Sequence, residues 1–337
     1  MHKLNRKEWF LAALFLFVLG LVNLAGDNKN EAAVFYNGVR RDIVVEDKKV
    51  EAEDFFALCG VPYDGAEKKA NLADLCARLN IVCRFDEEEN IYALGDTAEY
   101  AREVPVLMYH HLLPENELWQ RKRDNITITV EEFTAQMDYL ALNGWKCVSL
   151  EELEEFVRGE RLLAPKSVLL TFDDGFLSNY TYAYPILKER GMKAVLFVLS
   201  DYLSEEEKKF EPSLMQYLSR ADLLKMQDVF SYGSHTAALH QLKGHKSALC
   251  LADEETIVRD LARSRKALMN AYSISYPYGE YNDEVLKIAK ESGFRLGFAV
   301  GGHSVKMYDD PYTLGRFDMY RYRDTAKFQK MLESCAQ

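Results

Sequence analysis

The segment Val168-Leu169-Leu170-Thr171-Phe172-Asp173-Asp174-Gly175 decides how the central part of this chain folds. Its first five residues are apolar or of high β propensity, and they predict a buried strand that ends at Phe172. Two carboxylates follow at once, and Gly175 then allows a sharp turn. Adjacent carboxylates at the end of a buried strand repel each other unless a bound cation or a proton neutralises one of them. Capping of a following helix is the alternative interpretation of this pair.

Short apolar strands alternate with amphipathic helices on both sides of this segment. The predicted strands are 104–109, 146–148, 168–172, 193–199, 230–233, 274–276, 295–300 and 313–317. Such alternation is typical of an α/β fold in which helices cover a parallel sheet. About seven repeats favour a closed, distorted (β/α)7 barrel, in which functional groups gather at the carboxyl ends of the strands.

Two further groups of polar residues follow predicted strands. The segment 232–240 reads Tyr-Gly-Ser-His-Thr-Ala-Ala-Leu-His and places His235 and His240 after a strand. Imidazoles together with a carboxylate are a common hydrolytic metal set, so we expect these histidines and the aspartate pair to bind one divalent cation. Taken alone, two histidines more often have structural roles. Residues 276–279, Tyr-Pro-Tyr-Gly, form a tight turn whose backbone N–H can face a developing oxyanion.

Four motifs occur in a fixed order along the chain: Val-Leu-Met-Tyr-His-His at 106–111, Thr-Phe-Asp-Asp-Gly at 171–175, Ser-His-Thr-x-x-x-His at 234–240 and Tyr-Pro-Tyr-Gly at 276–279. With them, residues 104–323 resemble the polysaccharide deacetylases, the family of the NodB-homology domain (carbohydrate esterase family four).

The resemblance implies a role for each matched position. Asp173 corresponds to the general base, whereas Asp174, His235 and His240 correspond to the metal ligands. The backbone N–H of Tyr278 corresponds to the oxyanion donor, and the turn formed by Tyr276, Pro277, Tyr278 and Gly279 is expected to contact the substrate. The implied cofactor is a divalent metal, usually Zn²⁺, with Co²⁺, Ni²⁺ or Fe²⁺ as alternatives.

Two groups that the family uses lack an obvious counterpart in this chain. Many relatives have an arginine two residues before the proline of the third motif, where this chain has Ser275. Arg316, in the last predicted strand, is the candidate that supplies this charge, and an ordinary structural arginine is the alternative. His303 is the candidate for the general acid. His110 and His111 follow the first strand, and we expect one to support the site and the other to be structural.

These observations predict a metal-dependent hydrolase that removes N-acetyl groups from N-acetylglucosamine residues of a cell-wall or extracellular polysaccharide. An O-deacetylase acting on an ester-bearing glycan uses the same groups and is one alternative. A surface carbohydrate-binding protein without activity is the other. The 53 acidic against 42 basic side chains, a net charge of −11, argue against a nucleic-acid partner. The sequence does not specify an oligomeric state.

The amino-terminal part of the chain differs from the rest. Lys3, Arg6 and Lys7 precede an apolar run that continues to about Ala25. We expect residues 1–26 to be a signal anchor, or alternatively a cleaved signal peptide, that places the catalytic domain outside the cell membrane. Residues 27–100 are expected to form a small α+β stalk or wall-binding domain, and residues 101–337 the catalytic domain. The six cysteines have no metal-binding spacing, and we expect free thiols.

Overall fold

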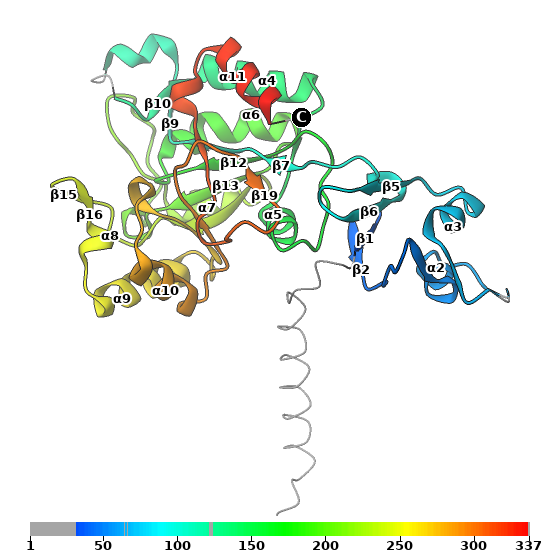
Figure 1. Ribbon diagram of the computed structural model, residues 1–337. Coiled ribbons are helices and arrows are strands. Elements are labelled where there is room, and N and C mark those ends of the chain that lie inside the picture. Colours follow the sequence, from blue (N-terminus) through cyan, green and yellow to red (C-terminus); the bar gives the residue numbers. More distant parts are fainter. Residues whose placement is uncertain (1–31, 64, 66, 121–123, 336–337) are drawn as a thin grey trace, which may run out of the picture. The chain divides into compact units, whose positions relative to one another are not determined.

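The computed structural model describes residues 32–63, 65, 67–120 and 124–335 (Figure 1). Contacts divide the described residues into two compact units, 32–34 with Arg41–Leu94 and Phe35–Arg40 with 95–335. The predicted signal anchor, residues 1–26, lies outside the described residues. None of the helices within the described ranges combines the length and the apolar composition that a membrane span requires.

The amino-terminal elements are short strands and two helices. They are β1 (Ala33–Tyr36), β2 (Val39–Arg41), β3 (Lys49–Glu51), α2 (Ala52–Leu58), β4 (Lys69–Asn71), α3 (Leu72–Arg78), β5 (Cys83–Asp86) and β6 (Ile91–Leu94). One sheet has the order β2-β1-β6-β5, and β5 and β6 form an antiparallel hairpin. Residues 43–45 are apolar but form no strand, because the Ile43 N–H donates to Arg41 O and closes a turn.

An eight-stranded parallel sheet forms the centre of the second unit, with the order β18-β17-β14-β13-β12-β8-β20 and β11 paired with β12. Its strands are β8 (Val106–Tyr109), β11 (Lys146–Cys147), β12 (Ser167–Phe172), β13 (Ala194–Val198), β14 (Phe230–Ser234), β17 (Ser273–Ser275), β18 (Leu296–Phe298) and β20 (Phe317–Asp318). The predicted strand 313–317 is mostly absent, because the Thr313 N–H donates to Asp310 O within a turn. Leu314 bridges to Phe298 in β18, and Phe317 in β20 pairs with Leu107 in β8. Residues 314–317 therefore contact both β18 and β8, which shows that the parallel sheet is strongly curled.

Helices connect the strands of this sheet. They are α4 (Val130–Leu142), α5 (Leu150–Val157), α6 (Tyr184–Glu189), α7 (Arg220–Lys225), α8 (Ala248–Leu251), α9 (Glu254–Ala267), α10 (Asp283–Glu291) and α11 (Thr325–Ser334). Helices α4, α6 and α11 lie together on one side of the sheet, and α9 lies beside α10 (Figure 1). Short strand pairs complete the unit: β7 (Glu103–Val104) with β19 (Val305–Lys306), β9 (His111–Leu113) with β10 (Thr127–Thr129), and β15 (Leu242–Lys243) with β16 (Lys246–Ser247).

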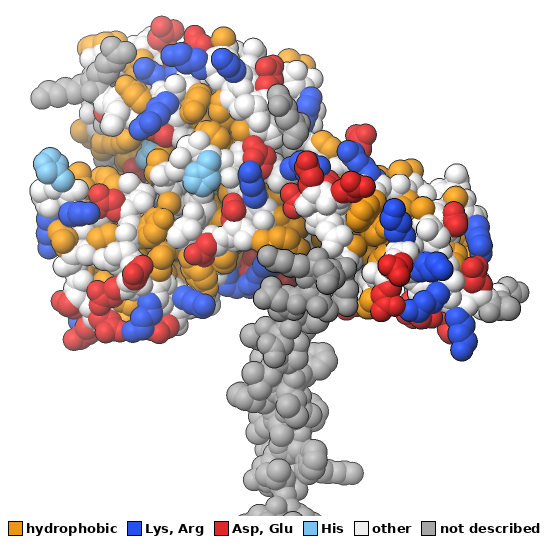
Figure 2. All heavy atoms as spheres, in the orientation of Figure 1, with side chains coloured by type: hydrophobic (Ala, Val, Ile, Leu, Met, Phe, Trp, Pro, Cys, Tyr) orange, Lys and Arg blue, Asp and Glu red, His pale blue; other side chains and the backbone are white. Residues whose placement is uncertain are grey.

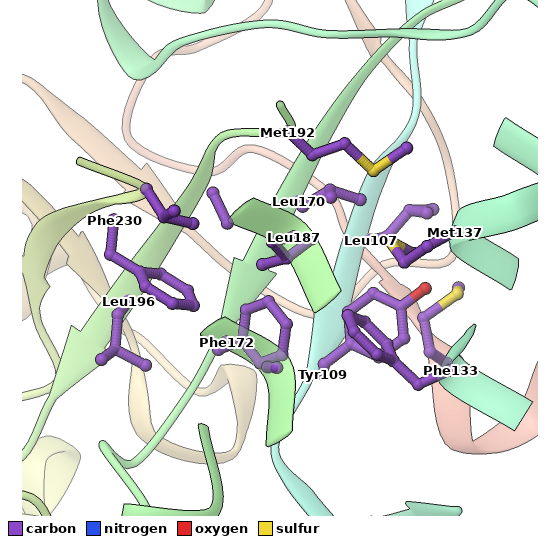
Figure 3. Packing of buried hydrophobic residues seen from close by; sticks show 14 of the residues in the cluster. Leu107, Tyr109, Phe133, Met137, Leu170, Phe172, Leu187, Met192, Leu196 and Phe230 are labelled. Carbon is purple, nitrogen blue, oxygen red and sulfur yellow. The ribbon is translucent and has the colours of Figure 1, made fainter. Parts of the chain in front are cut away.

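An aromatic cluster fixes the strand that carries the aspartate pair (Figure 3). The Phe172 ring lies 5.2 Å from the Tyr109 ring, 5.7 Å from the Phe133 ring and 5.5 Å from the Phe230 ring. Leu169 belongs to a different buried cluster, as expected from the alternation of side chains along a strand. Because both faces of β12 are close-packed, the turn at its carboxyl end is held firmly.

Candidate active site

Asp173 and Asp174 occupy the turn that follows β12, at the carboxyl end of the parallel sheet. The Asp173 N–H donates to Tyr109 O at 2.9 Å and so continues the pairing of β12 with β8. The chain then passes through left-handed conformations at Asp174 (φ 74) and Gly175 (φ 76), which aspartate tolerates better than most residues and glycine best. This reversal directs the two neighbouring carboxylates into different surroundings, although both are buried.

Asp174, His235 and His240 meet in one cluster. Asp174 Oδ1 lies 3.4 Å from Nε2 of His235 and 3.4 Å from Nε2 of His240. One ligand atom from each of the three residues lies within 4.8 Å of the others. Asp174 is only 6% exposed, and its Oδ1 has no hydrogen-bond partner among the described residues. A buried carboxylate oxygen without a donor is unfavourable, and a cation among these atoms removes the penalty.

Both imidazoles are held in the form that binds a metal. His235 Nδ1 lies 2.8 Å from Ser275 O; since a carbonyl only accepts, Nδ1 carries the proton and Nε2 presents its lone pair toward Asp174. Burial, together with the neighbouring His235, lowers the pKa of His240 to about 4, so its ring is neutral at pH 7. Two neutral imidazoles and a carboxylate therefore fit a divalent cation.

Asp173 pairs with an arginine from far along the chain. Arg316 is fully buried, and its Nη1 and Nη2 donate to Asp173 Oδ1 and Oδ2, both at 2.8 Å. Ser275 Oγ donates to Asp173 Oδ2 at 3.0 Å and accepts from Arg316 Nη2 at 2.7 Å. Burial raises the pKa of Asp173, but Arg316 and His235 outweigh it and hold that pKa below its ordinary value. These bonds use three of the about four lone-pair positions of the carboxylate, which leaves one on Oδ1.

The sheet explains how Arg316 replaces the arginine missing at position 275. Arg316 directly precedes β20, which pairs with β8, and β8 in turn pairs with β12. The Arg316 Nε donates to Ala299 O at 3.1 Å, which fixes the guanidinium between the first and last parts of the sheet. The expected contact between Arg316 and Asp173 is present, and Ser275 bridges the two residues. The sequence offered no signal for this bridge beyond the absence of the arginine.

Residues 161–297 match the family model described as polysaccharide deacetylase. The poly-beta-1,6-N-acetyl-D-glucosamine N-deacetylase of Staphylococcus aureus is 30% identical over 200 residues, which are 57% of this chain and 67% of that protein. The chain belongs to the polysaccharide deacetylase family. Because the members of this family are deacetylases, the chain is an enzyme. This sets aside the alternative of a carbohydrate-binding protein without activity.

Solved structures share the fold of this deacetylase. IcaB from Ammonifex degensii superposes with a TM-score of 0.60 at 27% identity, covering 71% of this chain and 99% of that one. The deacetylase PplD of Streptococcus pyogenes has a TM-score of 0.59 at 24% identity, covering 69% of this chain and 99% of that one. The curled parallel sheet is thus the sheet of known deacetylases.

His303, the predicted general acid, lies outside the cluster of Asp173, Asp174, His235 and His240. It is exposed and lines a pocket with Glu103, Lys306 and Cys335, to which none of Asp174, His235 and His240 contributes. A Cβ on Gly315 would lie 2.5 Å from its Nε2, so the ring rests against that glycine. The chain continues for several residues between the end of β18 and His303, which takes the imidazole away from the strand end where it was expected.

His110 is the histidine that the sheet places next to the base. Tyr109 pairs with Phe172, so the residues that follow them, His110 and Asp173, are neighbours. His110 is also one of the groups whose charge lowers the pKa of Asp173. Its side chain is half-buried, and its carbonyl accepts from Asn179 Nδ2 at 2.7 Å. The sequence signal was a histidine directly after the first strand.

His111 differs from its neighbour, as expected for one of this pair. It is fully buried, and its ring meets the Phe176 ring edge-on at 5.2 Å. Contacts of this kind are typical of a structural histidine.

Only part of the predicted substrate-binding turn is open to a substrate. Tyr276 and Pro277 are buried, so their side chains belong to the core, which corrects the expectation that they contact substrate. Tyr278 is 44% exposed, adopts a left-handed conformation (φ 61), and its hydroxyl donates to His240 O at 3.1 Å. Gly279 also has a positive φ of 72, and a Cβ there would lie 2.8 Å from Val300. Tyr278 is therefore the side chain of this turn that borders the triad.

Proposed function

We propose that this polysaccharide deacetylase is a metal-dependent hydrolase that removes N-acetyl groups from N-acetylglucosamine residues of a cell-wall or extracellular polysaccharide. One observation carries the proposal: of two adjacent buried carboxylates, Asp173 is bound by Arg316, whereas Asp174 has an unpartnered oxygen beside two imidazoles. The name of the Staphylococcus aureus relative, a poly-beta-1,6-N-acetyl-D-glucosamine N-deacetylase, supports the substrate class.

The triad Asp174, His235 and His240 would hold the cation. Two nitrogen ligands and one oxygen ligand suit Zn²⁺, and Co²⁺, Ni²⁺ or Fe²⁺ accept the same donors. When bound, the cation supplies Lewis acidity, which polarises a carbonyl and makes water more acidic. A third histidine or a cysteine is not needed, because catalytic sites of this kind keep positions for water and substrate.

The remaining groups of the site move protons and hold charge. Asp173 accepts the proton of the attacking water at the open position of Oδ1. Arg316 keeps this carboxylate ionised at neutral pH and fixes its orientation through two bonds of 2.8 Å. The backbone N–H of Tyr278 donates to the oxyanion of the tetrahedral intermediate. His110 gives a proton to the departing sugar nitrogen, so that cleavage of the C–N bond releases acetate and a free amine.

The charge of the surface suits this product. Acidic side chains gather over α9 and α10 on the face shown in Figure 2, and the exposed acidic residues of these helices include Glu254, Glu255, Asp283 and Glu284. N-deacetylation creates ammonium groups on the polymer, and an acidic surface attracts such cations. A neutral, acetylated polymer is not repelled by the same surface.

A panel of acetylated carbohydrates tests the proposal. The full chain is incubated with β-1,6-linked N-acetylglucosamine oligomers, chitooligosaccharides, peptidoglycan fragments and acetylated xylan, and mass spectrometry records the loss of acetyl groups. We expect loss from at least one N-acetylglucosamine polymer, abolished by a chelator and restored by Zn²⁺. Turnover of acetylated xylan alone contradicts the amide substrate, and full activity in chelator-treated, metal-free protein contradicts the metal dependence.

We also propose that residues 1–26 anchor the enzyme in the cell membrane with the catalytic unit outside, and that residues 27–100 serve as a stalk or wall-binding domain. Basic residues followed by an apolar run support this orientation. Fractionation of cells that produce the full chain tests it. The protein is expected in the membrane fraction and accessible to protease added outside the cells, and recovery in the cytosol contradicts the proposal.

A further inference from the structure

A buried carboxylate from α9 holds the loop that joins His235 to His240. Asp260 is only 4% exposed. Its Oδ1 accepts the Ala237 N–H at 2.7 Å, and its Oδ2 accepts the Ala238 N–H at 2.9 Å. Each oxygen of this carboxylate therefore binds one of two consecutive amides between the two metal-binding histidines.

The loop needs such support because its backbone conformation is unfavourable. Thr236 has a φ of 72, which is a rare conformation for a β-branched residue and persists only where the surroundings enforce it. On its amino-terminal side, the Thr236 N–H donates to Ser234 Oγ at 3.1 Å. On its carboxy-terminal side, the next two amides are those bound by Asp260. The strained residue is thus fixed from both sides.

The two histidines depend on this loop to different degrees. His235 is held by other contacts, since its N–H donates to Val198 O at 3.0 Å and its Nδ1 lies 2.8 Å from Ser275 O. His240 lies at the far end of the loop, and its side chain is 20% exposed compared with 2% for His235. Besides its contact with Asp174, the His240 ring faces the rings of His235 and Tyr278, both at 4.7 Å between ring centroids, and its carbonyl accepts from the Tyr278 hydroxyl at 3.1 Å. The path of the loop therefore determines where the His240 ring lies.

We propose that Asp260 is a positioning residue that fixes His240 against Asp174 through the loop and thereby sets how tightly the site holds its cation, an inference that rests on the proposed metal site. A carboxylate is required because two N–H donors need two acceptors. Asparagine offers one acceptor and turns an NH₂ group toward the second amide. Burial raises the pKa of Asp260, which is the expected direction for a carboxylate in this environment.

A cationic side chain supports the same loop from outside. Arg263 Nη2 lies 2.9 Å from Asp201 Oδ2 and 3.5 Å from Asp260 Oδ2. The Asp201 N–H in turn donates to Ala237 O at 3.1 Å. Two aspartates that share one arginine therefore bind both the N–H and the carbonyl of Ala237.

The Asp260→Asn variant of the full chain tests the inference. Its affinity for Zn²⁺ is measured by competition with a chromophoric chelator, and its thermal unfolding is measured without metal. Loss of groups that orient metal ligands lowers metal affinity about 10–100-fold, and we expect a loss in this range. Activity is expected to return at saturating Zn²⁺, because the residue acts on occupancy rather than on the reacting atoms.

Glu152→Gln is the matched control. The Glu152 carboxylate also accepts a backbone amide, that of Ser149 at 2.8 Å at the start of α5, and its loss is expected to leave the Zn²⁺ affinity unchanged. Wild-type affinity in folded Asp260→Asn protein overturns the inference and leaves the proposed function intact. Absence of Zn²⁺ binding in the wild-type protein overturns the metal site and this inference together. If Asp260→Asn does not fold, Asp260→Glu, whose longer side chain displaces both acceptors from the Ala237 and Ala238 amides, takes its place under the same criterion.

Discussion

Asp173 and Asp174 are neighbours in the chain and are 2% and 6% exposed, yet their surroundings are opposite. Asp173 is bound by both Nη atoms of Arg316 and by Ser275 Oγ. Asp174 Oδ1 has two imidazole nitrogens at 3.4 Å and no hydrogen-bond donor among the described residues. Two adjacent buried carboxylates remain charged only when each has its own counter-charge. For Asp173 the protein supplies it through Arg316, whereas for Asp174 we propose that a divalent cation supplies it.

This difference separates a base from a ligand. Arginine stays protonated at all relevant pH values, so Asp173 is ionised whether or not a cation is present. Asp174, in contrast, has only the two imidazoles beside its Oδ1, and in the proposed function the cation balances its charge. Different surroundings often give two similar titratable side chains different catalytic roles.

Asp174→Ala is expected to have the largest effect. It removes the one anionic ligand of the triad and therefore both the bound cation and its Lewis acidity, which contributes several kcal/mol to such reactions. We expect loss of stoichiometric Zn²⁺ and a fall in kcat/KM of at least about 10⁴-fold. Metal analysis and the deacetylation assay measure the two quantities on the same sample. A variant that keeps both its metal and its activity contradicts the ligand assignment.

Asp173→Asn is expected to lose activity but keep the metal. The amide cannot accept the water proton as a carboxylate does, and loss of a general base costs about 10²–10⁴-fold in rate. Zn²⁺ content should remain near that of the wild type, because Asp173 is not one of the three residues whose ligand atoms meet. Loss of metal together with activity in this variant breaks the distinction between the two carboxylates.

The half of the site that follows directly from strand ends was predictable from the sequence. Asp173, Asp174 and His235 lie within two residues of the ends of β12 and β14, and parallel strands bring such positions to the same edge. Arg316 was predictable only as an option, because its contact with Asp173 spans 143 residues and depends on β20 returning beside β8. No local pattern encodes that pairing.

The position of His303 was predicted wrongly and the role of Asp260 was not predicted, for different reasons. His303 follows β18 through a loop, and the direction of a side chain on a loop is not encoded by strand periodicity. Asp260 resembles any other charged residue of a polar helix. Its position was nevertheless a signal, since Ile257, Leu261 and Ser264 share the buried side of α9 with it at helical spacing. A carboxylate on the apolar side of a helix indicates a buried partner.

Arg316→Met tests how much the internal counter-charge stabilises the fold. Breaking a buried ion pair by removing one partner costs about 3–5 kcal/mol, and we expect a loss of that size in urea unfolding at pH 7. Arg259→Met is the control, because its pair with Glu255 is exposed and such pairs contribute about 0–1 kcal/mol. Equal losses of unfolding free energy in the two variants would contradict the expectation that the buried pair stabilises the fold more than the exposed pair.

The pH dependence of the Arg316→Met effect follows from the sign of the pKa shift. Arg316 lowers the pKa of Asp173 in the folded protein, so the pair stabilises fully above the pKa of an unfolded aspartate, about 3.9. This contribution is lost as the pH falls through the lower, folded pKa. The difference in unfolding free energy between wild type and variant is therefore expected to be largest above about pH 5 and to shrink in acid. A difference that grows toward low pH contradicts the shift.

Ser275→Ala is expected to have the smallest effect of the series. The hydroxyl donates to Asp173 and accepts from Arg316, and hydrogen bonds to charged groups contribute about 1.5–3 kcal/mol. Ser273, on the same strand, is the matched control because its buried Oγ has no hydrogen-bond partner among the described residues, and Ser273→Ala is expected to be neutral. In Ser275→Ala the two Arg316 bonds still orient the base, so kcat should fall by less than about tenfold while stability falls by the amount of one such bond. A larger loss of activity than of stability would show that the serine, and not the arginine, aligns Asp173.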